Sequence, residues 1–167
     1  STQFDPEQFE PDDFQRCAIA PVRGVAKRQA EHLAGRLCAR EALWRQAGIN
    51  GVPAVGDDRA PQWPAAVCGS ITHGNGWAAA VVGARAQWQG LGLDIEKRLA
   101  PERALHLAGE LLTPAELQRL QGLDEAAQAL QITLTFSLKE SLFKALYPLV
   151  GVRFYFQEAE VLSYSPD

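Results

Sequence analysis

One pattern of apolar residues constrains the fold of this chain more than any other feature. From Val25 to Gln46 these residues recur at helical spacing, and Gly48 follows as a natural helix end. Three short strand candidates come next, at 66–72, 77–82 and 89–96, and an Asn-Gly turn joins the first two. A long helix and short strands, without a repeating strand-helix-strand order, predict the α+β class.

The second half of the chain predicts several short elements. Thr113, Pro114 and Glu116 provide an N-cap, a first-turn proline and a capping box, which predict a helix to about residue 121. We also expect a strand at 132–136, an amphipathic helix at 137–147, and a closing pair of strands at 152–156 and 160–164. Residues 1–16 are expected to be extended, and residues 51–64 to form a loop.

Composition excludes several classes of protein. A hydrophobic fraction of 47% excludes a disordered chain, and the lack of a long uncharged apolar run excludes a membrane span. The net charge of −4, from 16 basic and 20 acidic residues, argues against a nucleic-acid binder. The length of 167 residues suits one domain or two small lobes.

The cysteines and the absence of targeting motifs indicate the cellular compartment that we expect for the protein. Three cysteines without CxxC spacing predict free or buried thiols in a reducing compartment. No signal peptide or lipidation motif is present, so we expect a cytoplasmic protein. The chain contains no methionine, and we therefore expect it to be trimmed or incompletely represented.

Basic side chains recur every four residues along the helix predicted at 25–46. These are Arg28, His32, Arg36 and Arg40. Residues spaced by four lie on nearly the same side of a helix, with a gradual shift around its axis. A local basic cluster on this side could hold a small polyanion in spite of the negative net charge. The other interpretation is an ordinary solvated helix face.

Two carboxylates stand one residue apart in the segment 90–96. Side chains alternate along a strand, so Asp94 and Glu96 share one face. They would provide part of a Mg²⁺ site, because Mg²⁺ binds one or two carboxylates together with waters and phosphate oxygens. Gly90 and Gly92 allow a ligand or a backbone to approach closely. The alternative is a strand end with two solvated acids.

A second candidate site lies on the helix predicted at 137–147. Glu140 and Lys144 are four residues apart and share one helix face. The carboxylate could be a base or a metal ligand beside a phosphate-binding cation. Two simpler interpretations remain, since Ser137 and Glu140 fit a capping box, and Glu140 with Lys144 fits a surface ion pair.

A third candidate site surrounds the end of the first predicted strand. His73 follows Ser70 and Thr72 and precedes Gly74. A histidine in this position can face a phosphate with hydroxyl donors beside it. A histidine without any such role is the alternative.

The chain resembles the surfactin-type 4′-phosphopantetheinyl transferases in three segments that occur in the same order. These are GSITH at 69–73, GLGLDIE at 90–96 and FSLKESLFKALYP at 136–148. The helix KRQAEHLAGRLCAR at 27–40 and the loop RAPQWP at 59–64 narrow the resemblance to the enterobactin-synthetase subgroup. The likeness covers about residues 25–160, and its last motif is the most specific.

The resemblance implies a pseudo-two-fold fold of two similar α/β lobes, residues 1–90 and 91–167, with coenzyme A (CoA) between them. It implies an enzyme that moves the phosphopantetheine arm of CoA to a serine of an apo acyl or peptidyl carrier protein, with release of 3′,5′-ADP. We expect a monomer without nucleic-acid or membrane partners. Members usually continue beyond the equivalent of Asp167, so we expect some closing strands of the second lobe to be missing.

The resemblance also implies a role for individual residues. Asp94, Glu96 and Glu140 would bind Mg²⁺ at the CoA pyrophosphate. Glu140 would also help to deprotonate the carrier serine, and Lys144 would neutralise the departing pyrophosphate. His73 would be a catalytic residue together with Glu140 and Lys144. The residues implied to contact CoA are Lys27, Arg28, Arg59, Ser70, Thr72, His73 and Lys144. The family pattern has serine at Thr72 and often Gly-Lys-Pro where this chain has Arg59-Ala60-Pro61.

Two other functions stay open. One is a CoA- or nucleotide-binding module that has lost catalysis, which would not need the complete set of acidic residues. The other is a purely structural α+β domain, which Mg²⁺-dependent CoA binding would exclude. For the enzyme, we expect some leucines near the predicted helix start at Thr113 to face the carrier protein; the alternative is that all four belong to the core. They are Leu111, Leu112, Leu117 and Leu120.

Overall fold

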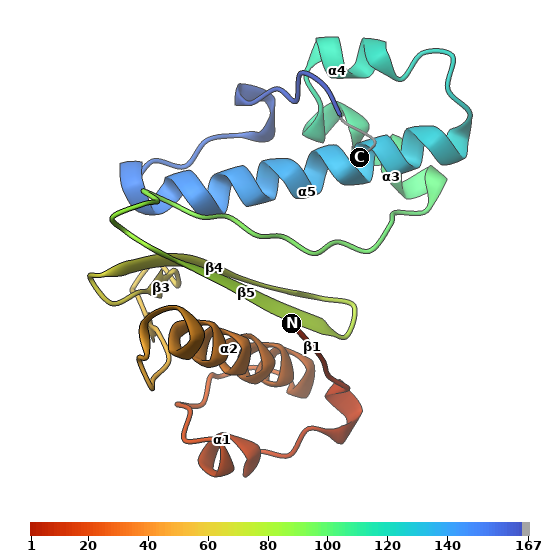
Figure 1. Ribbon diagram of the computed structural model, residues 1–167. Helices are drawn as coiled ribbons and strands as arrows, with labels where there is room; N and C mark the ends of the chain where they lie inside the picture. Colours follow the sequence, from red (N-terminus) through yellow and green to blue (C-terminus); the bar gives the residue numbers. More distant parts are fainter. Residues whose placement is uncertain (165–167) are drawn as a thin grey trace.

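Helices lie on both sides of a small antiparallel sheet (Figure 1). The computed structural model of the chain describes residues 1–164. The sheet has the strand order β1 (Thr2–Gln3), β5 (Trp77–Ala84), β4 (Val67–Gly74). A separate two-stranded ribbon, β2 (Ala54–Val55) and β3 (Pro61–Gln62), forms within the loop predicted at 51–64.

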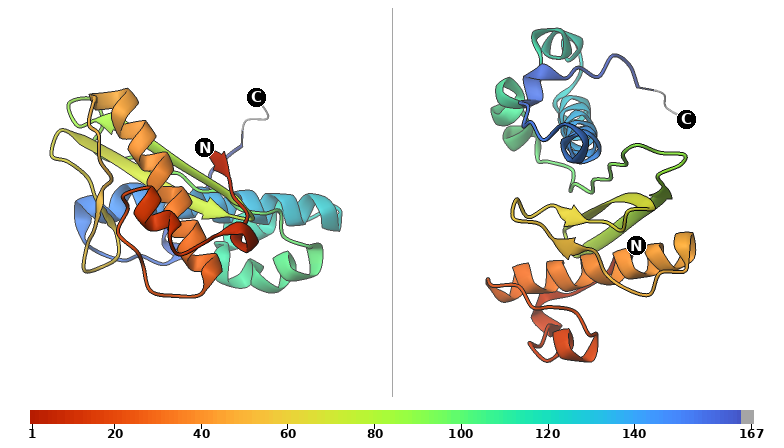
Figure 2. Two further views of the ribbon diagram at one scale, coloured as in Figure 1. Left: turned by 90° about the horizontal axis from the view of Figure 1, so that it is seen from below. Right: turned by 90° about the vertical axis from the view of Figure 1, so that its left-hand side faces the viewer.

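Two helices precede strands β2 to β5 in the chain, and three described helices follow them. They are α1 (Asp13–Arg16), α2 (Ala26–Ala47), α3 (Pro101–Leu111), α4 (Pro114–Arg119) and α5 (Glu125–Val150), with short 3₁₀ turns η1 (Pro6–Gln8) and η2 (Phe156–Glu158). Helix α2 covers one face of the sheet, while α5 and then α3 and α4 lie beyond the other face (Figures 1 and 2).

The first half of the chain folds largely as its local pattern predicts. Helix α2 ends at Gly48, whose left-handed φ of 66° is favourable for glycine. Asn75 and Gly76 both have positive φ and make the tight turn between β4 and β5. Small side chains let the helix approach the sheet, where Ala34 and Cys38 of α2 pack on Ala78 of β5.

The strand predicted at 132–136 is wrong, because these residues belong to the long helix α5. β-branched residues favour strands, but here two threonine hydroxyls donate to carbonyls one helical turn back. Thr133 Oγ1 donates to Ala129 O at 2.7 Å, and Thr135 Oγ1 donates to Gln131 O at 2.8 Å. Ile132 is fully buried in a core shared by α3, α4 and α5. Tertiary packing therefore overrides the local preference.

Three further predicted strands and one predicted helix start are also wrong. Residues 89–96, 152–156 and 160–164 form no strand. Ser137 lies in the middle of α5, so Glu140 does not cap a helix. Helix α3 was not predicted, although Pro101 at its first turn and the buried Ala104 and Ala108 are a helical signature.

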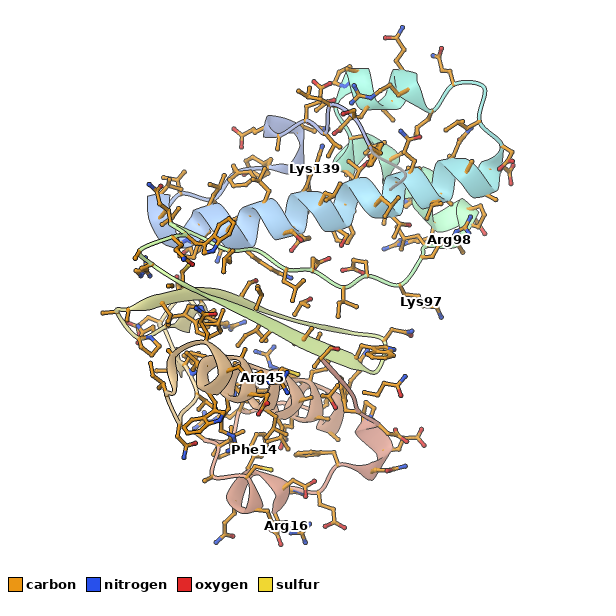
Figure 3. All side chains as sticks on the ribbon, in the orientation of Figure 1. Phe14, Arg16, Arg45, Lys97, Arg98 and Lys139 are labelled. Atoms are coloured by element: carbon orange, nitrogen blue, oxygen red, sulfur yellow. The ribbon has the colours of Figure 1, made fainter. Side chains whose placement is uncertain are left out.

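A buried ion pair joins the C-terminal helices. Lys139 points from α5 toward α3 and α4, and its Nζ donates to Glu116 Oε2 at 2.6 Å and to Leu111 O at 2.9 Å (Figure 3). Glu116 also accepts the Thr113 N–H, which completes the predicted capping box of α4, and the Val161 N–H. Burial raises the pKa of Glu116, but these hydrogen bonds outweigh burial and lower its pKa overall.

The mixture of helices and sheet confirms the α+β class. Within residues 1–164 every strand lies before residue 85, so the pseudo-two-fold arrangement of two similar lobes stays a prediction, and residues 165–167 of the predicted second lobe lie outside the described part. Cys17, Cys38 and Cys68 are free thiols, as predicted. In the described part of the chain, no helix is both long and apolar enough to cross a membrane.

We predict that Lys139→Met lowers the free energy of unfolding by about 3–5 kcal/mol, because it leaves the Glu116 carboxylate buried without its cation. Urea unfolding at pH 7 measures this change. The control is Glu41→Ala, which removes an exposed ion pair with Arg45 and should cost less than about 1 kcal/mol. Equal losses in the two variants would contradict a structural role for the buried pair.

Candidate active site

The segment that contains Asp94 runs between β4 and α5 (Figure 1). It is held to β4 by side chains. The Leu93 N–H donates to Ser70 Oγ at 3.1 Å, and the Ile95 N–H donates to Thr72 Oγ1 at 3.0 Å. These two buried hydroxyls take the place of backbone carbonyls, which is why the segment follows β4 without forming the predicted strand.

Glycines bring the same segment against the backbone of α5. A Cβ at Gly92 would collide with the Ser141 carbonyl oxygen, and a Cβ at Gly90 would collide with the Ala145 carbonyl oxygen. The expectation of a close approach at these glycines is confirmed, and the approaching group is a helix backbone.

Asp94 is the centre of the polar contacts between the sheet and α5. Its side chain is only 4% exposed. The carboxylate accepts hydrogen bonds from Thr72 Oγ1 at 3.3 Å, from Ser137 Oγ at 2.9 Å and from Lys144 Nζ at 2.5 Å. A buried carboxylate is tolerated only with such partners, so these contacts fix both the segment and the lysine.

Glu96 and Glu140 belong to the same electrostatic cluster. Burial raises the pKa of Glu140, and the charge of Asp94 raises it further, while Lys144 lowers it. Burial also raises the pKa of Glu96, with further increases from Asp94 and Glu140 and an opposing effect of Lys144. The charge of Asp94 therefore acts on both glutamates that were predicted to bind the metal with it.

The oxygen donors of this group fit a hard divalent cation. As they stand, no three His, Cys, Asp or Glu side chains within residues 1–164 converge closely enough to hold a metal ion, and Lys144 is paired with Asp94. Mg²⁺ needs only one or two carboxylates when phosphate oxygens and waters complete its shell. The cluster thus suits a cation that binds together with a phosphate ligand.

Basic residues surround a pocket of about 410 Å³ between α2 and β4. Arg28, His32 and Arg36 of α2 line it with Arg59. The solvated-face interpretation is wrong for Arg36, which is buried, whereas Arg28 is exposed. Arg36 is buried and donates to Pro53 O at 2.9 Å, which ties the loop to the helix. Such a concentration of cations suits a phosphate group.

His73 also lines this first pocket. Its Nδ1 lies 3.7 Å from Glu31 Oε2. Burial lowers the pKa of His73, Glu31 opposes this, and the cations Lys144 and Arg28 lower it further. A neutral imidazole can still donate one N–H to a phosphate oxygen.

Two more pockets continue the first toward Glu140. The second, of about 250 Å³, shares Arg59 with the first pocket and adds Lys144 and Arg153. The third, of about 380 Å³, shares Arg153 with the second and is lined by Glu140. Three adjoining pockets thus run from the start of α2 to the middle of α5.

The structure brings most of the predicted site residues to this row of pockets. Ser70 lines the second pocket, although its hydroxyl is bound to Leu93, and Thr72 is buried beneath Asp94. Lys27 is exposed and lines none of the three pockets. Arg153 was missed, because it lies after α5 in a segment without a motif, and only the folding of that segment back onto α5 brings it to the site.

The predicted carrier-facing leucines are mostly core. Leu111, Leu112 and Leu120 are buried among α3, α4 and α5, and only Leu117 is exposed, at 37%. The alternative interpretation of these leucines is therefore confirmed for three of the four.

We predict that Gly92→Ala destabilises the protein by about 1–3 kcal/mol, because the new Cβ would overlap a backbone carbonyl of α5 that cannot rotate away. The matched control is Gly109→Ala in α3, where a Cβ meets nothing within 4 Å and should stabilise the helix by about 0.5–1 kcal/mol. Thermal unfolding compares them, and the same sign for both changes would contradict the packing described here.

Comparison with known proteins supports the predicted enzyme class. Residues 18–83 match the family model of the 4′-phosphopantetheinyl transferase N-terminal domain, and residues 90–165 match that of the 4′-phosphopantetheinyl transferase superfamily. The chain is 43% identical to enterobactin synthase component D of Escherichia coli K12 over 145 residues, which are 86% of this chain and 68% of that protein.

Two further relatives carry the enzyme name itself. The 4′-phosphopantetheinyl transferase Svp of Streptomyces mobaraensis is 39% identical over 94% of this chain and 65% of its own length. The corresponding protein Npt of Nocardia iowensis is 32% identical over 84% of this chain and 61% of its own length. The chain therefore belongs to the superfamily of 4′-phosphopantetheinyl transferases, enzymes that transfer phosphopantetheine to carrier proteins.

Proposed function

We propose that this chain transfers the 4′-phosphopantetheine arm of CoA to a serine of an apo acyl or peptidyl carrier protein, with Mg²⁺ and with release of 3′,5′-ADP. The observation that carries this proposal is the row of three pockets, which is basic at one end and reaches the Glu140 carboxylate at the other. CoA carries a 3′-phosphate and a pyrophosphate, so it needs cations at more than one point along its length.

The 3′-phosphate of CoA is assigned to the basic end of the row. Arg28 and Arg59 line the first pocket there, and Lys27 stands beside Arg28 on α2. His73, on β4, would contact the phosphates. Contacts of Ser70 and Thr72 with CoA phosphates are part of the proposal, although both hydroxyls also position the segment 93–95.

The divalent cation is assigned to Asp94, Glu96 and Glu140, whose mutual repulsion a cation would relieve. When bound, it would neutralise negative charge on the CoA pyrophosphate. Lys144, which lines the second pocket and donates its Nζ hydrogen bond to Asp94, supplies a further positive charge from the protein itself. A positive charge there stabilises the 3′,5′-ADP as it departs.

Glu140 is the proposed general base. In the transfer, the serine Oγ attacks the phosphorus that carries pantetheine, and the bond from this phosphorus to the bridging oxygen of the pyrophosphate breaks. Glu140 takes the serine proton, directly or through a water, and the bridging oxygen leaves as part of 3′,5′-ADP. The raised pKa of Glu140 makes it a better base than an ordinary glutamate.

The division into lobes 1–90 and 91–167 is part of the same proposal. The two family models that match 18–83 and 90–165 support it. The monomeric state, the cytoplasmic location and the absence of nucleic-acid and membrane partners stay predictions. A CoA-binding module without catalysis remains the second candidate, and the next experiment separates it from the enzyme.

We predict that Glu140→Gln reduces carrier modification by at least about two orders of magnitude, because the amide cannot accept the serine proton. Intact-mass analysis of an apo carrier after incubation with CoA and Mg²⁺ measures this loss. The melting temperature should stay equal or rise, since a raised pKa means that the charged carboxylate costs stability at neutral pH.

Added Mg²⁺ should raise the melting temperature of the wild type more than that of Glu140→Gln. Full transfer activity in the variant would exclude Glu140 as the base, and normal activity in excess chelator would exclude the metal. Magnesium-dependent CoA binding without any transfer by the wild type would favour the non-catalytic module.

We predict that Arg59→Ala weakens CoA binding much more than it weakens binding of dephospho-CoA, which lacks the 3′-phosphate. A charge-assisted contact of this kind contributes about 1.5–3 kcal/mol, or roughly 10- to 150-fold in affinity. Isothermal titration with both ligands measures the difference. Equal losses for the two ligands would show that Arg59 shapes the loop and does not bind the 3′-phosphate.

A further inference from the structure

Lys144 is the positive charge that the acidic cluster already has. Its Nζ donates to Asp94 Oδ1 at 2.5 Å and to Leu93 O at 3.3 Å. Burial raises the pKa values of Glu96 and Glu140, and the positive charge of Lys144 lowers both. A single lysine thus acts on all three carboxylates that are proposed to bind the metal.

The Asp94 carboxylate has little room for a cation while its present contacts persist. The side chain is 4% exposed. Oδ1 accepts from Lys144 Nζ and from Thr72 Oγ1 at 3.3 Å, while Oδ2 accepts from Ser137 Oγ at 2.9 Å. A carboxylate oxygen offers about two acceptor positions, so both positions of Oδ1 are used. A cation that binds Oδ1 must therefore displace one of its two donors.

Of the donors to Asp94, Lys144 is the one that can leave. Thr72 Oγ1 also accepts the Ile95 N–H at 3.0 Å, which holds the backbone of this segment to β4. Ser137 lies in the middle of α5 and carries its hydroxyl on a single carbon. The Lys144 side chain is 27% exposed, and its ammonium group ends a flexible four-carbon chain.

A second place for the ammonium group lies beside the first. Lys144 lines the second pocket, of about 250 Å³, together with Arg59 and Arg153. While this pocket holds no anion, the two arginines repel the lysine and favour its contact with Asp94. A pyrophosphate in the pocket reverses this balance, because it attracts all three cations.

We propose that Lys144 is a switch that couples metal binding to CoA binding. Without CoA, its ammonium group stays on Asp94 Oδ1 and keeps a divalent cation away. When the CoA pyrophosphate enters the second pocket, the ammonium group moves to a phosphate oxygen and leaves Oδ1 to the cation. The buried carboxylate thus exchanges one positive partner for another and is never left unpaired.

This inference rests on the proposed function and adds to it a mutual dependence of the two ligands. The metal binds tightly only when CoA is present. Because coupling between two sites is reciprocal, the metal must also strengthen CoA binding by the same factor.

Binding of Mn²⁺ measures this coupling without any transfer reaction. Mn²⁺ prefers the same oxygen ligands as Mg²⁺, and its electron paramagnetic resonance signal reports the free ion. The wild type and Lys144→Met are each titrated with Mn²⁺, in the presence and in the absence of CoA. A titration of CoA alone corrects for the Mn²⁺ that CoA itself binds.

The switch predicts different effects of Lys144→Met in the two conditions. Without CoA, the variant should bind Mn²⁺ at least about tenfold more tightly than the wild type, because a charge-assisted hydrogen bond no longer competes for Oδ1. With CoA, the two proteins should agree within about threefold, because the wild-type lysine has already left Asp94. A lysine that repels the metal from a fixed position would give the same gain in both conditions, and that result overturns the switch.

The matched control is Ser137→Ala. It removes a donor from the same carboxylate, at Oδ2, and leaves Lys144 on Oδ1. Without CoA, its Mn²⁺ affinity should stay within about threefold of the wild type, since loss of one neutral hydrogen bond has a small net effect. A gain as large as that of Lys144→Met overturns the proposal, because the metal then competes with the serine.

Carrier modification by the wild type separates the switch from the proposed function. A wild type that modifies an apo carrier protein, but binds Mn²⁺ equally well with and without CoA, overturns the switch alone. A wild type that neither binds CoA nor modifies a carrier overturns the proposed function and the switch with it.

Melting temperatures check that the variants fold. If Lys144→Met does not fold, a crystal structure of the wild type with CoA decides the question. Lys144 Nζ should then lie more than about 4 Å from Asp94 Oδ1, beyond the distance of an ion pair. An unchanged contact between Lys144 and Asp94 in that complex overturns the switch.

Discussion

The buried carboxylate of Asp94 is the contact on which the rest of this structure depends. The apolar clusters around α2 and around α3 to α5 are separate, and polar contacts bridge the space between the sheet and α5. Asp94 accepts from Thr72 on β4 and from Ser137 and Lys144 on α5. Because an unpaired carboxylate is costly in such a place, the partners from both sides must stay together.

The same requirement shapes the site. Holding Asp94 in its buried position also holds Lys144 at the second pocket. Burial raises the pKa values of Glu96 and Glu140, and the charge of Asp94 raises both further. Residues expected to touch only a ligand therefore have a structural task as well. Ser70 and Thr72 are the clearest examples, since their hydroxyls replace a strand's carbonyls.

The two lysines of the α5 motif show what a local sequence pattern can predict about a side chain and what it cannot. Lys139 and Lys144 are five residues apart, which places them about 140° apart around the helix. Lys144 lines the second pocket, as the motif implied. Lys139 is 1% exposed and pairs with Glu116 from α4, and no spacing within the motif could have indicated that partner. Its role depends on a residue that is distant in sequence.

The sequence by itself determined the features that depend on neighbours along the chain. Helix α2 and its glycine end, the Asn75-Gly76 turn and the capping box of α4 follow from backbone preferences and short-range hydrogen bonds. Only the tertiary structure decided that residues 132–136 are helical, that Ser137 binds Asp94 and caps nothing, and that Arg153 joins the site. The physical reason is that burial and pairing between distant segments outweigh local preferences that amount to less than about 1 kcal/mol per residue.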